Sequence, residues 1–196
     1  MAPTYWMQQT GRKYTKIIVS QVDMYNVKID WILKAGILVL SAVLVFVLYS
    51  SIHERIVDVG DSAPDFTITA DNGRTITAAD FGGRLLVLNF WATWCQPCVE
   101  EVPSLDEFAK EMAGSGVVVL GVSMDTNPKL YHDFLSRTHV SFMTARDPDA
   151  KISQDYGTFK YPESYIIDAK GKVVQKIIGA TNWTDGSMVN AVKSFL

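Results

Sequence analysis

Cysteine is scarce in this chain, with two residues among 196. Two thiols are too few for a disulfide scaffold or for a four-cysteine zinc site, so neither class fits. Seven prolines and 13 glycines exclude a collagen-like or proline-rich chain. A net charge of −3 provides no basic excess, so we expect no nucleic-acid partner. No motif for a flavin, haem or nucleotide is present either, and we expect neither a cofactor nor a bound metal.

The charge that is present is unevenly divided along the chain. Residues 1–30 carry four Lys and Arg against two Asp and Glu, whereas residues 53–196 carry 13 against 19. With 48% hydrophobic and 20% charged residues, the composition is that of a globular protein and not of a disordered one. A basic head before an acidic body indicates a membrane topology, because positive charge concentrates on the cytoplasmic side.

One long apolar run lies between these two parts. Residues 35–49 read AGILVLSAVLVFVLY and contain no charge. Extended to residues 31–52, the run is long enough to cross a hydrocarbon core as a helix, with Trp31 and Tyr49 at the interfacial positions. An uncleaved signal-anchor is preferred over a cleaved signal peptide, because no clear small-x-small site follows the run. It is also preferred over a buried core helix, which belongs in a much larger protein.

The positive-inside rule then orders the chain. We expect a cytoplasmic tail at 1–30, a transmembrane signal-anchor helix at 31–52, a short linker at 53–62 and a globular domain at 63–196. The domain would lie outside the cytoplasm, on the periplasmic side of the cell membrane. The lipid bilayer would be the partner of the single-pass helix.

Hydrophobic patterning predicts alternating strands and helices in the domain. Two predominantly apolar runs, at 85–91 and 117–123, are typical of central parallel strands. This order of elements predicts an α/β fold with a central mixed sheet flanked by helices. The other expected elements are a hairpin of strands 65–69 and 74–78, helices at 95–112, 128–137 and 149–156, a strand at 141–145, a hairpin of 164–168 and 172–178, and a last helix capped by Asp185 and ending at Leu196.

Both cysteines stand in one Cys-x-x-Cys motif, Trp94-Cys95-Gln96-Pro97-Cys98. The motif follows an apolar strand and opens a predicted helix. At that place unpaired N–H groups and the helix dipole favour a thiolate on Cys95, while Cys98 lies one turn on and is less exposed. One sulfur can attack a partner disulfide and the other can resolve the mixed disulfide, which leaves Cys95 bonded to Cys98.

Three other interpretations of the motif stay open. A purely structural disulfide would close too short a loop to stabilise the fold much. A Cu(I) site is chemically feasible, but it would need a further ligand, and the candidates Met143, His132 and His139 are distant in the sequence. Inert core cysteines fit poorly with a strand-to-helix turn.

Three segments resemble a known family: VGDSAPDFTIT, LLVLNFWATWCQPCVEEVPSL and YGTFKYPESYIIDAKGKVV. They are similar to the membrane-anchored TlpA/ResA/CcmG family of thioredoxin-like thiol-disulfide oxidoreductases. The resemblance implies a thioredoxin-like fold with an N-terminal β-hairpin extension, and dithiol–disulfide exchange outside the cytoplasm. For many members it also implies reduction of apocytochrome c thiols for haem attachment.

The resemblance also implies roles for single residues. It makes Cys95 the exposed nucleophile, Cys98 the buried resolving thiol and Pro162 a cis-proline that faces them. A cis Tyr161–Pro162 bond would leave the Tyr161 backbone free to pair with a substrate strand. Trp94, next to Cys95, is expected to contact the substrate as well.

Acidic residues near the motif are candidates for moving protons. Glu101, three residues after Cys98, matches a family glutamate beside the active site, and its carboxylate would raise the pKa values of the thiols. Glu163 follows the proline as in the Pro-Glu-Thr of the CcmG-type branch, and the two glutamates would make an acidic groove. Asn89 stands where cytosolic thioredoxin has an aspartate under the disulfide, and an amide cannot act as a base.

These features together predict a membrane-tethered protein-disulfide reductase. Its partners would be disulfide-containing proteins, with apocytochrome c as a candidate, and a membrane thiol electron donor. Three alternatives stay open: a dithiol oxidase of DsbA type, a thiol peroxidase-like antioxidant protein and a non-enzymatic Cu(I)-binding module. Against the first, the Gln-Pro pair between the cysteines resembles thioredoxin more than an oxidase. Against the second, Ala92 stands where the peroxidase motif has threonine.

Overall fold

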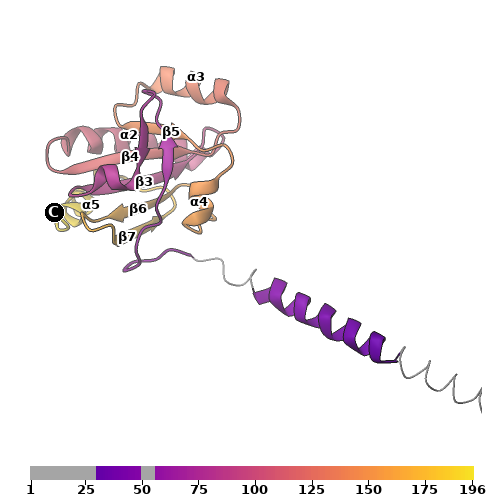
Figure 1. Ribbon diagram of the computed structural model, residues 1–196. Helices are drawn as coiled ribbons and strands as arrows, with labels where there is room; N and C mark the ends of the chain where they lie inside the picture. Colours follow the sequence, from indigo (N-terminus) through magenta and orange to yellow (C-terminus); the bar gives the residue numbers. More distant parts are fainter. Residues whose placement is uncertain (1–29, 50–55) are drawn as a thin grey trace, which may run out of the picture. The chain divides into compact units, whose positions relative to one another are not determined.

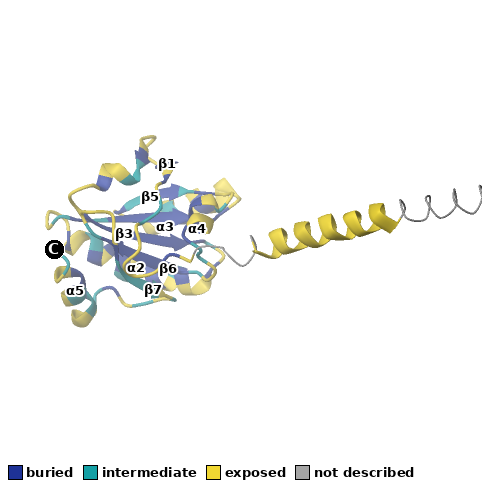
Figure 2. Cartoon of the chain, turned by 60° about the horizontal axis from the view of Figure 1, so that its bottom comes forward, coloured by how far each residue is buried: buried dark blue, intermediate teal, exposed yellow. Residues whose placement is uncertain are grey.

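The computed structural model describes residues 30–49 and 56–196, which fall in two compact units. The first contains a helix of 20 residues, Asp30–Tyr49, long and apolar enough to cross a membrane (Figure 1). All of its residues are exposed (Figure 2). The helix agrees with the predicted span apart from its ends. Residues 50–52 of that span, and the tail at 1–29, lie outside the described residues.

The second unit is built on a five-stranded mixed sheet in the order β5-β4-β3-β6-β7. Strands β3 (Leu85–Trp91), β4 (Val117–Ser123) and β5 (Met143–Arg146) are parallel to one another. Strand β6 (Glu163–Ile167) is antiparallel to β3, and β7 (Val173–Ile178) is antiparallel to β6. All seven residues of β3 are buried, as expected for a central strand covered on both faces.

Helices cover both faces of this sheet, as Figure 1 shows. Because side chains alternate along a strand, β3 contributes to two separate apolar clusters. Leu86, Leu88 and Phe90 belong to the cluster that contains side chains of α3, of α4 and of the first turns of α2, whereas Leu85 and Val87 belong to the cluster that contains side chains of the later turns of α2 and of α5. The helices are α2 (Gln96–Glu111), α3 (Pro128–Thr138), α4 (Lys151–Asp155) and α5 (Gly186–Lys193).

An N-terminal hairpin, β1 (Thr67–Thr69) and β2 (Thr75–Thr77), forms a second small sheet. Gly73 in its turn has a φ of 78°, a conformation that favours glycine. Asp71 links the hairpin to the body of the domain, since it accepts hydrogen bonds from Tyr131 at 2.5 Å and Thr144 at 2.6 Å.

The predicted mixed sheet, flanking helices and N-terminal hairpin are confirmed, and β3 and β4 have the predicted bounds. Outer elements differ. The strand expected from residue 141 begins at Met143, because the Ser141 N–H donates to the Asp106 carboxylate at 2.6 Å instead. A 3-10 helix at Ala78–Phe81 (η1) was not predicted; Thr77 and Asp80 cap it reciprocally. The last helix ends at Lys193, short of the predicted Leu196.

The compact unit already includes the segment from residue 57 onward, which the sequence analysis places in a linker. Val57 is buried, and its N–H donates to the Tyr156 carbonyl at 3.1 Å. Gly60 N–H donates to the Val173 carbonyl at 2.8 Å, and Ser62 pairs with Lys172. Residues 57–62 therefore lie against β7 and the end of α4. A sequence pattern cannot show this, since the partners are about a hundred residues away along the chain.

Candidate active site

The two cysteines lie where the central strand meets its helix. β3 ends at Trp91, and Cys95 is the N-cap residue of α2. The Cys95 sulfur accepts a hydrogen bond from the Cys98 N–H at 3.3 Å, and Pro97 occupies the first turn without loss of a needed donor. This is the position at which the N–H groups of a helix favour a negative sulfur, as the sequence predicts.

Cys95 and Cys98 form a disulfide, with an S–S distance of 2.08 Å and a Cα–Cα distance of 5.3 Å. Cys95 is 7% exposed and Cys98 1%. The order of the two exposures agrees with the expected roles. In this disulfide form, however, Cys95 is itself a buried residue and not an exposed one. Neighbouring Trp94 is 64% exposed, and Gln96 and Pro97 between the cysteines are exposed as well.

The loop before Cys95 is held by a carboxylate that the sequence analysis did not single out. Asp125 is buried just beyond the end of β4. It accepts hydrogen bonds from the Thr93 N–H at 2.9 Å, the Thr93 hydroxyl at 2.5 Å and the Ser123 hydroxyl at 2.6 Å. A polar residue directly after a central parallel strand was the available signal, because the carboxyl ends of such strands meet at one edge of the sheet.

Pro162 lies at that same edge because β6 runs antiparallel to β3. The first residue of β6, Glu163, is in register with Phe90 near the end of β3. The Tyr161–Pro162 bond is cis, as predicted. The Tyr161 ring meets the Trp94 ring edge to face, with centroids 5.9 Å apart. In the described part of the chain, no hydrogen bond uses the Tyr161 backbone N–H or carbonyl.

Glu101 lies one turn after Cys98 and is 3% exposed. Its carboxylate accepts from Trp183 Nε1 at 2.8 Å, the Thr181 N–H at 3.1 Å and Asn89 Nδ2 at 3.3 Å. Burial raises the pKa of Glu101, and these hydrogen bonds oppose the rise only in part. Glu101 also lines a surface cleft of about 480 Å³ whose other residues include Ser104. Trp183, which orients the carboxylate from the far end of the chain, had no sequence signal.

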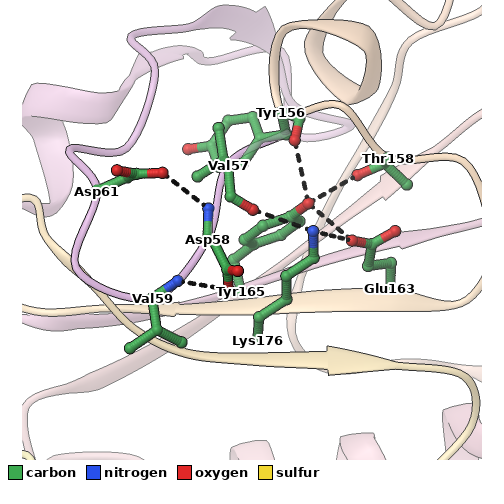
Figure 3. Close-up of polar contacts among 9 residues, drawn as sticks. All are labelled: Val57, Asp58, Val59, Asp61, Tyr156, Thr158, Glu163, Tyr165 and Lys176. Carbon is green, nitrogen blue, oxygen red and sulfur yellow. Dashed lines mark hydrogen bonds and ion pairs between the residues drawn. The ribbon is translucent and has the colours of Figure 1, made fainter. Parts of the chain in front are cut away.

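Glu163 is placed differently from the prediction. Its exposure is 0%, and Figure 3 shows its carboxylate turned toward Tyr165 and Lys176. Oε1 accepts from the Tyr165 hydroxyl at 2.8 Å and pairs with Lys176 Nζ at 2.9 Å. The prediction of an acidic groove lined by Glu101 and Glu163 is wrong. Residues 163 and 164 point to opposite faces of the sheet, and it is Ser164 that shares a face with Asn89 and Glu101.

The comparisons with known proteins agree with this geometry. The model of the AhpC/TSA family matches residues 59–176. The thiol-disulfide oxidoreductase ResA of Bacillus cereus is 34% identical over 145 residues, which cover 73% of this chain and 84% of that protein. The chain belongs to the AhpC/TSA family. Its relatives make it a ResA-like thiol-disulfide oxidoreductase, and ResA of Bacillus subtilis is 30% identical over 150 residues, 75% of this chain and 84% of that protein.

Solved structures show the same fold. A candidate thiol:disulfide interchange protein DsbE from Chlorobium tepidum superposes with a TM-score of 0.63 at 29% identity, covering 70% of this chain and 94% of that one. StoA of Bacillus subtilis, at 21% identity, has a TM-score of 0.57 over 68% of this chain and 96% of its own. The AhpC/TSA chain described here therefore has the expected thioredoxin-like fold, with the Cys-x-x-Cys motif as its redox site.

Proposed function

We propose that this chain is a membrane-anchored protein-disulfide reductase that works outside the cytoplasm. The observation that carries the proposal is the juxtaposition of the Cys95–Cys98 disulfide at a helix N-terminus with the cis-proline loop, through the contact of Trp94 and Tyr161. The apolar helix Asp30–Tyr49 supports the anchor, and the basic residues before it support a cytoplasmic N-terminus.

Exchange begins from the reduced dithiol. The Cys95 thiolate attacks one sulfur of a substrate disulfide, forming a mixed disulfide and releasing the other substrate sulfur as a thiolate. The Cys98 thiolate then attacks Cys95, which frees the second substrate thiol and closes the Cys95–Cys98 disulfide. Two electrons pass to the substrate, so a membrane thiol donor must reduce the disulfide before the next turnover.

Substrate binding is assigned to the residues around the disulfide. The Tyr161 backbone is available for an extended substrate segment, which adds to the protein as a short strand would. The exposed Trp94 ring covers an apolar side chain next to the substrate cysteine. Glu101 serves as the proton carrier, because its raised pKa allows it to take up and release a proton closer to neutral pH than an ordinary carboxyl group does. Protons would reach the carboxyl from solvent through the surface cleft that Glu101 lines.

Apocytochrome c is the substrate class we propose, on the strength of the ResA-like relatives and the Pro162-Glu163 pair. A short peptide with an oxidised Cys-x-x-Cys-His motif is the matching probe. The Cys98→Ser variant should accumulate a mixed disulfide with this peptide, since the resolving sulfur is gone, whereas Cys95→Ser should not. Equal trapping by both variants would contradict the assignment of Cys95 as the nucleophile.

The direction of exchange is tested by the equilibrium reduction potential in a thiol redox buffer. A value of about −230 mV or lower supports a reductant that needs an electron supply. A value near about −120 mV would make the chain a dithiol oxidase instead, and the cytochrome c assignment would fall with it.

A further inference from the structure

A buried ion pair lies behind the cis-proline loop, on the face of the sheet opposite to Glu101. Glu163 is fully buried and the Lys176 side chain is 8% exposed. Lys176 Nζ is 2.9 Å from Glu163 Oε1 and donates to the Val57 carbonyl at 3.0 Å. The ammonium also lies 5.1 Å from the centroid of the Tyr165 ring (Figure 3). The direct exchange chemistry uses none of these groups.

The pair joins two parts of the chain that are far apart in sequence. On one side is Glu163, which is bonded directly to Pro162. On the other is Val57, whose N–H and carbonyl are both held by the domain, at Tyr156 and at Lys176. Residues 57–61 then turn back through Asp61, whose carboxylate accepts the Asp58 N–H at 3.0 Å. Lys176 thus contacts both the strand after the cis-proline and this segment.

The cost of this arrangement indicates that it has a purpose beyond stability. Two charges are removed from water, and Glu163 Oε2 is buried with no hydrogen-bond partner among residues 30–49 and 56–196. Buried ion pairs of this kind are often no more stable than apolar residues of the same volume, and in some proteins they are retained because they specify one geometry. The geometry specified here is that of the backbone next to Tyr161 and Pro162.

We propose that Lys176 is a positioning residue for disulfide exchange, which ties residues 57–61 to Glu163 and so holds the substrate-binding backbone at Tyr161 and Pro162. This inference rests on the proposed function, because it assumes that a substrate segment binds there. Residues 57–61, which follow the apolar helix in the sequence, thereby help to hold the active site in place. Lys176 acts through Glu163 and does not touch the reacting sulfurs.

Single replacement of Lys176 would leave Glu163 charged and unpaired, so a loss of peptide binding could not be separated from a loss of stability. The test therefore uses Lys176→Met together with Glu163→Gln in the full chain in detergent. The double variant removes both charges, keeps an acceptor for the Tyr165 hydroxyl, and breaks the link to Val57. Lys172→Met is the matched control: Lys172 also bonds to this segment, at the Gly60 carbonyl, but it is exposed and has no contact with Glu163.

The reduced chain is mixed with excess oxidised Cys-x-x-Cys-His peptide, and its oxidation is followed in single-turnover experiments. The double variant should raise the half-saturating peptide concentration about tenfold, because a small displacement of a positioning group weakens productive binding. Its limiting rate should change less than about twofold, as should the rate at which dithiothreitol reduces its disulfide, since a small thiol needs no backbone pairing. Lys172→Met should match the unmodified chain in all three measurements.

The contribution of residues 57–61 is tested separately by Asp61→Ala, which removes the bond to the Asp58 N–H and leaves the ion pair intact. A rise in the half-saturating peptide concentration, smaller than that of the double variant, is expected. An unchanged value in the double variant overturns the proposal and leaves Lys176 with a purely structural role. An unchanged value in Asp61→Ala alone overturns the part assigned to the segment. If the unmodified chain does not reduce the peptide at all, the result contradicts the proposed function and not the role of Lys176.

Discussion

Glu101 and Glu163 are both buried carboxylates near the redox site. Glu101 lies one helical turn after Cys98, Glu163 directly follows Pro162, and the two side chains are on opposite faces of the sheet. Glu101 is on the α2 and α5 face, where Trp183, Thr181 and Asn89 donate uncharged hydrogen bonds to it. Glu163 is on the α3 and α4 face, where it meets the ammonium of Lys176. The same residue type therefore has two different electrostatic environments about one active site.

The difference shows what each carboxylate can do. A carboxylate held by neutral donors keeps most of its desolvation penalty, so its pKa rises and it can exchange protons. A carboxylate paired with a buried ammonium belongs to a charge pair, which specifies geometry. We expect Glu101 to contribute to the chemistry and Glu163 to the shape of the substrate-binding edge.

The largest expected effect comes from breaking the pair on one side only. Lys176→Met leaves Glu163 charged in an apolar environment, and the loss of unfolding free energy should be about 3–5 kcal/mol. Urea unfolding of the full chain in detergent, followed by the fluorescence of the buried tryptophans, measures it. A loss below about 1 kcal/mol would mean that Glu163 is not a buried charge in solution.

Glu101→Gln should slow exchange with the peptide disulfide by about a hundredfold at most, the lower end of what a lost acid–base group costs. Its pH–rate profile should lack the inflection that the Glu101 carboxyl gives the unmodified chain. Glu100→Gln is the matched control, because Glu100 is exposed and its carboxylate accepts a hydrogen bond from Gln96 and from no other residue of the described ranges. A retained inflection in Glu101→Gln would assign the titration to another group.

A smaller effect concerns stability against pH. The folded-state pKa of Glu101 is raised above its ordinary value of 4.5, so the folded chain binds this proton more tightly than the unfolded chain does. The unmodified protein should therefore lose stability relative to Glu101→Gln as pH rises from 4.5 through the raised pKa. Unfolding at a series of pH values compares the two, and parallel curves would contradict the assignment.

The smallest expected effect is that of removing both members of the pair. Lys176→Met with Glu163→Gln should unfold within about 1 kcal/mol of the unmodified chain, since no buried charge is left without its partner. The same double variant is expected to bind the peptide more weakly. If the double variant regains the stability that Lys176→Met loses but still binds the peptide weakly, the ion pair positions the substrate-binding backbone independently of its effect on stability.

Much of the fold follows from local patterns. The apolar runs at 85–91 and 117–123 are the central strands with the predicted bounds, because a strand buried on both faces reads as a nearly continuous apolar run. The bounds of the peripheral elements were predicted less accurately, since hydrogen bonds to side chains such as those of Asp106 and Asp80 decide where these elements begin. The cis-proline and the N-cap position of Cys95 were also predictable, the first from the family resemblance and the second from the strand-to-helix context.

The sequence by itself determined the redox group of this protein, a dithiol where a strand meets a helix, and an apolar segment long enough to cross a membrane. Both are encoded by neighbouring residues, so a local pattern contains them. Only the tertiary structure decided what surrounds each glutamate, because Trp183 and Lys176 reach them from the last third of the chain. Burial and charge pairing depend on these long-range contacts, and they separate the carboxylate with a raised pKa, for which we propose proton transfer, from the one in an ion pair, for which we propose a positioning role.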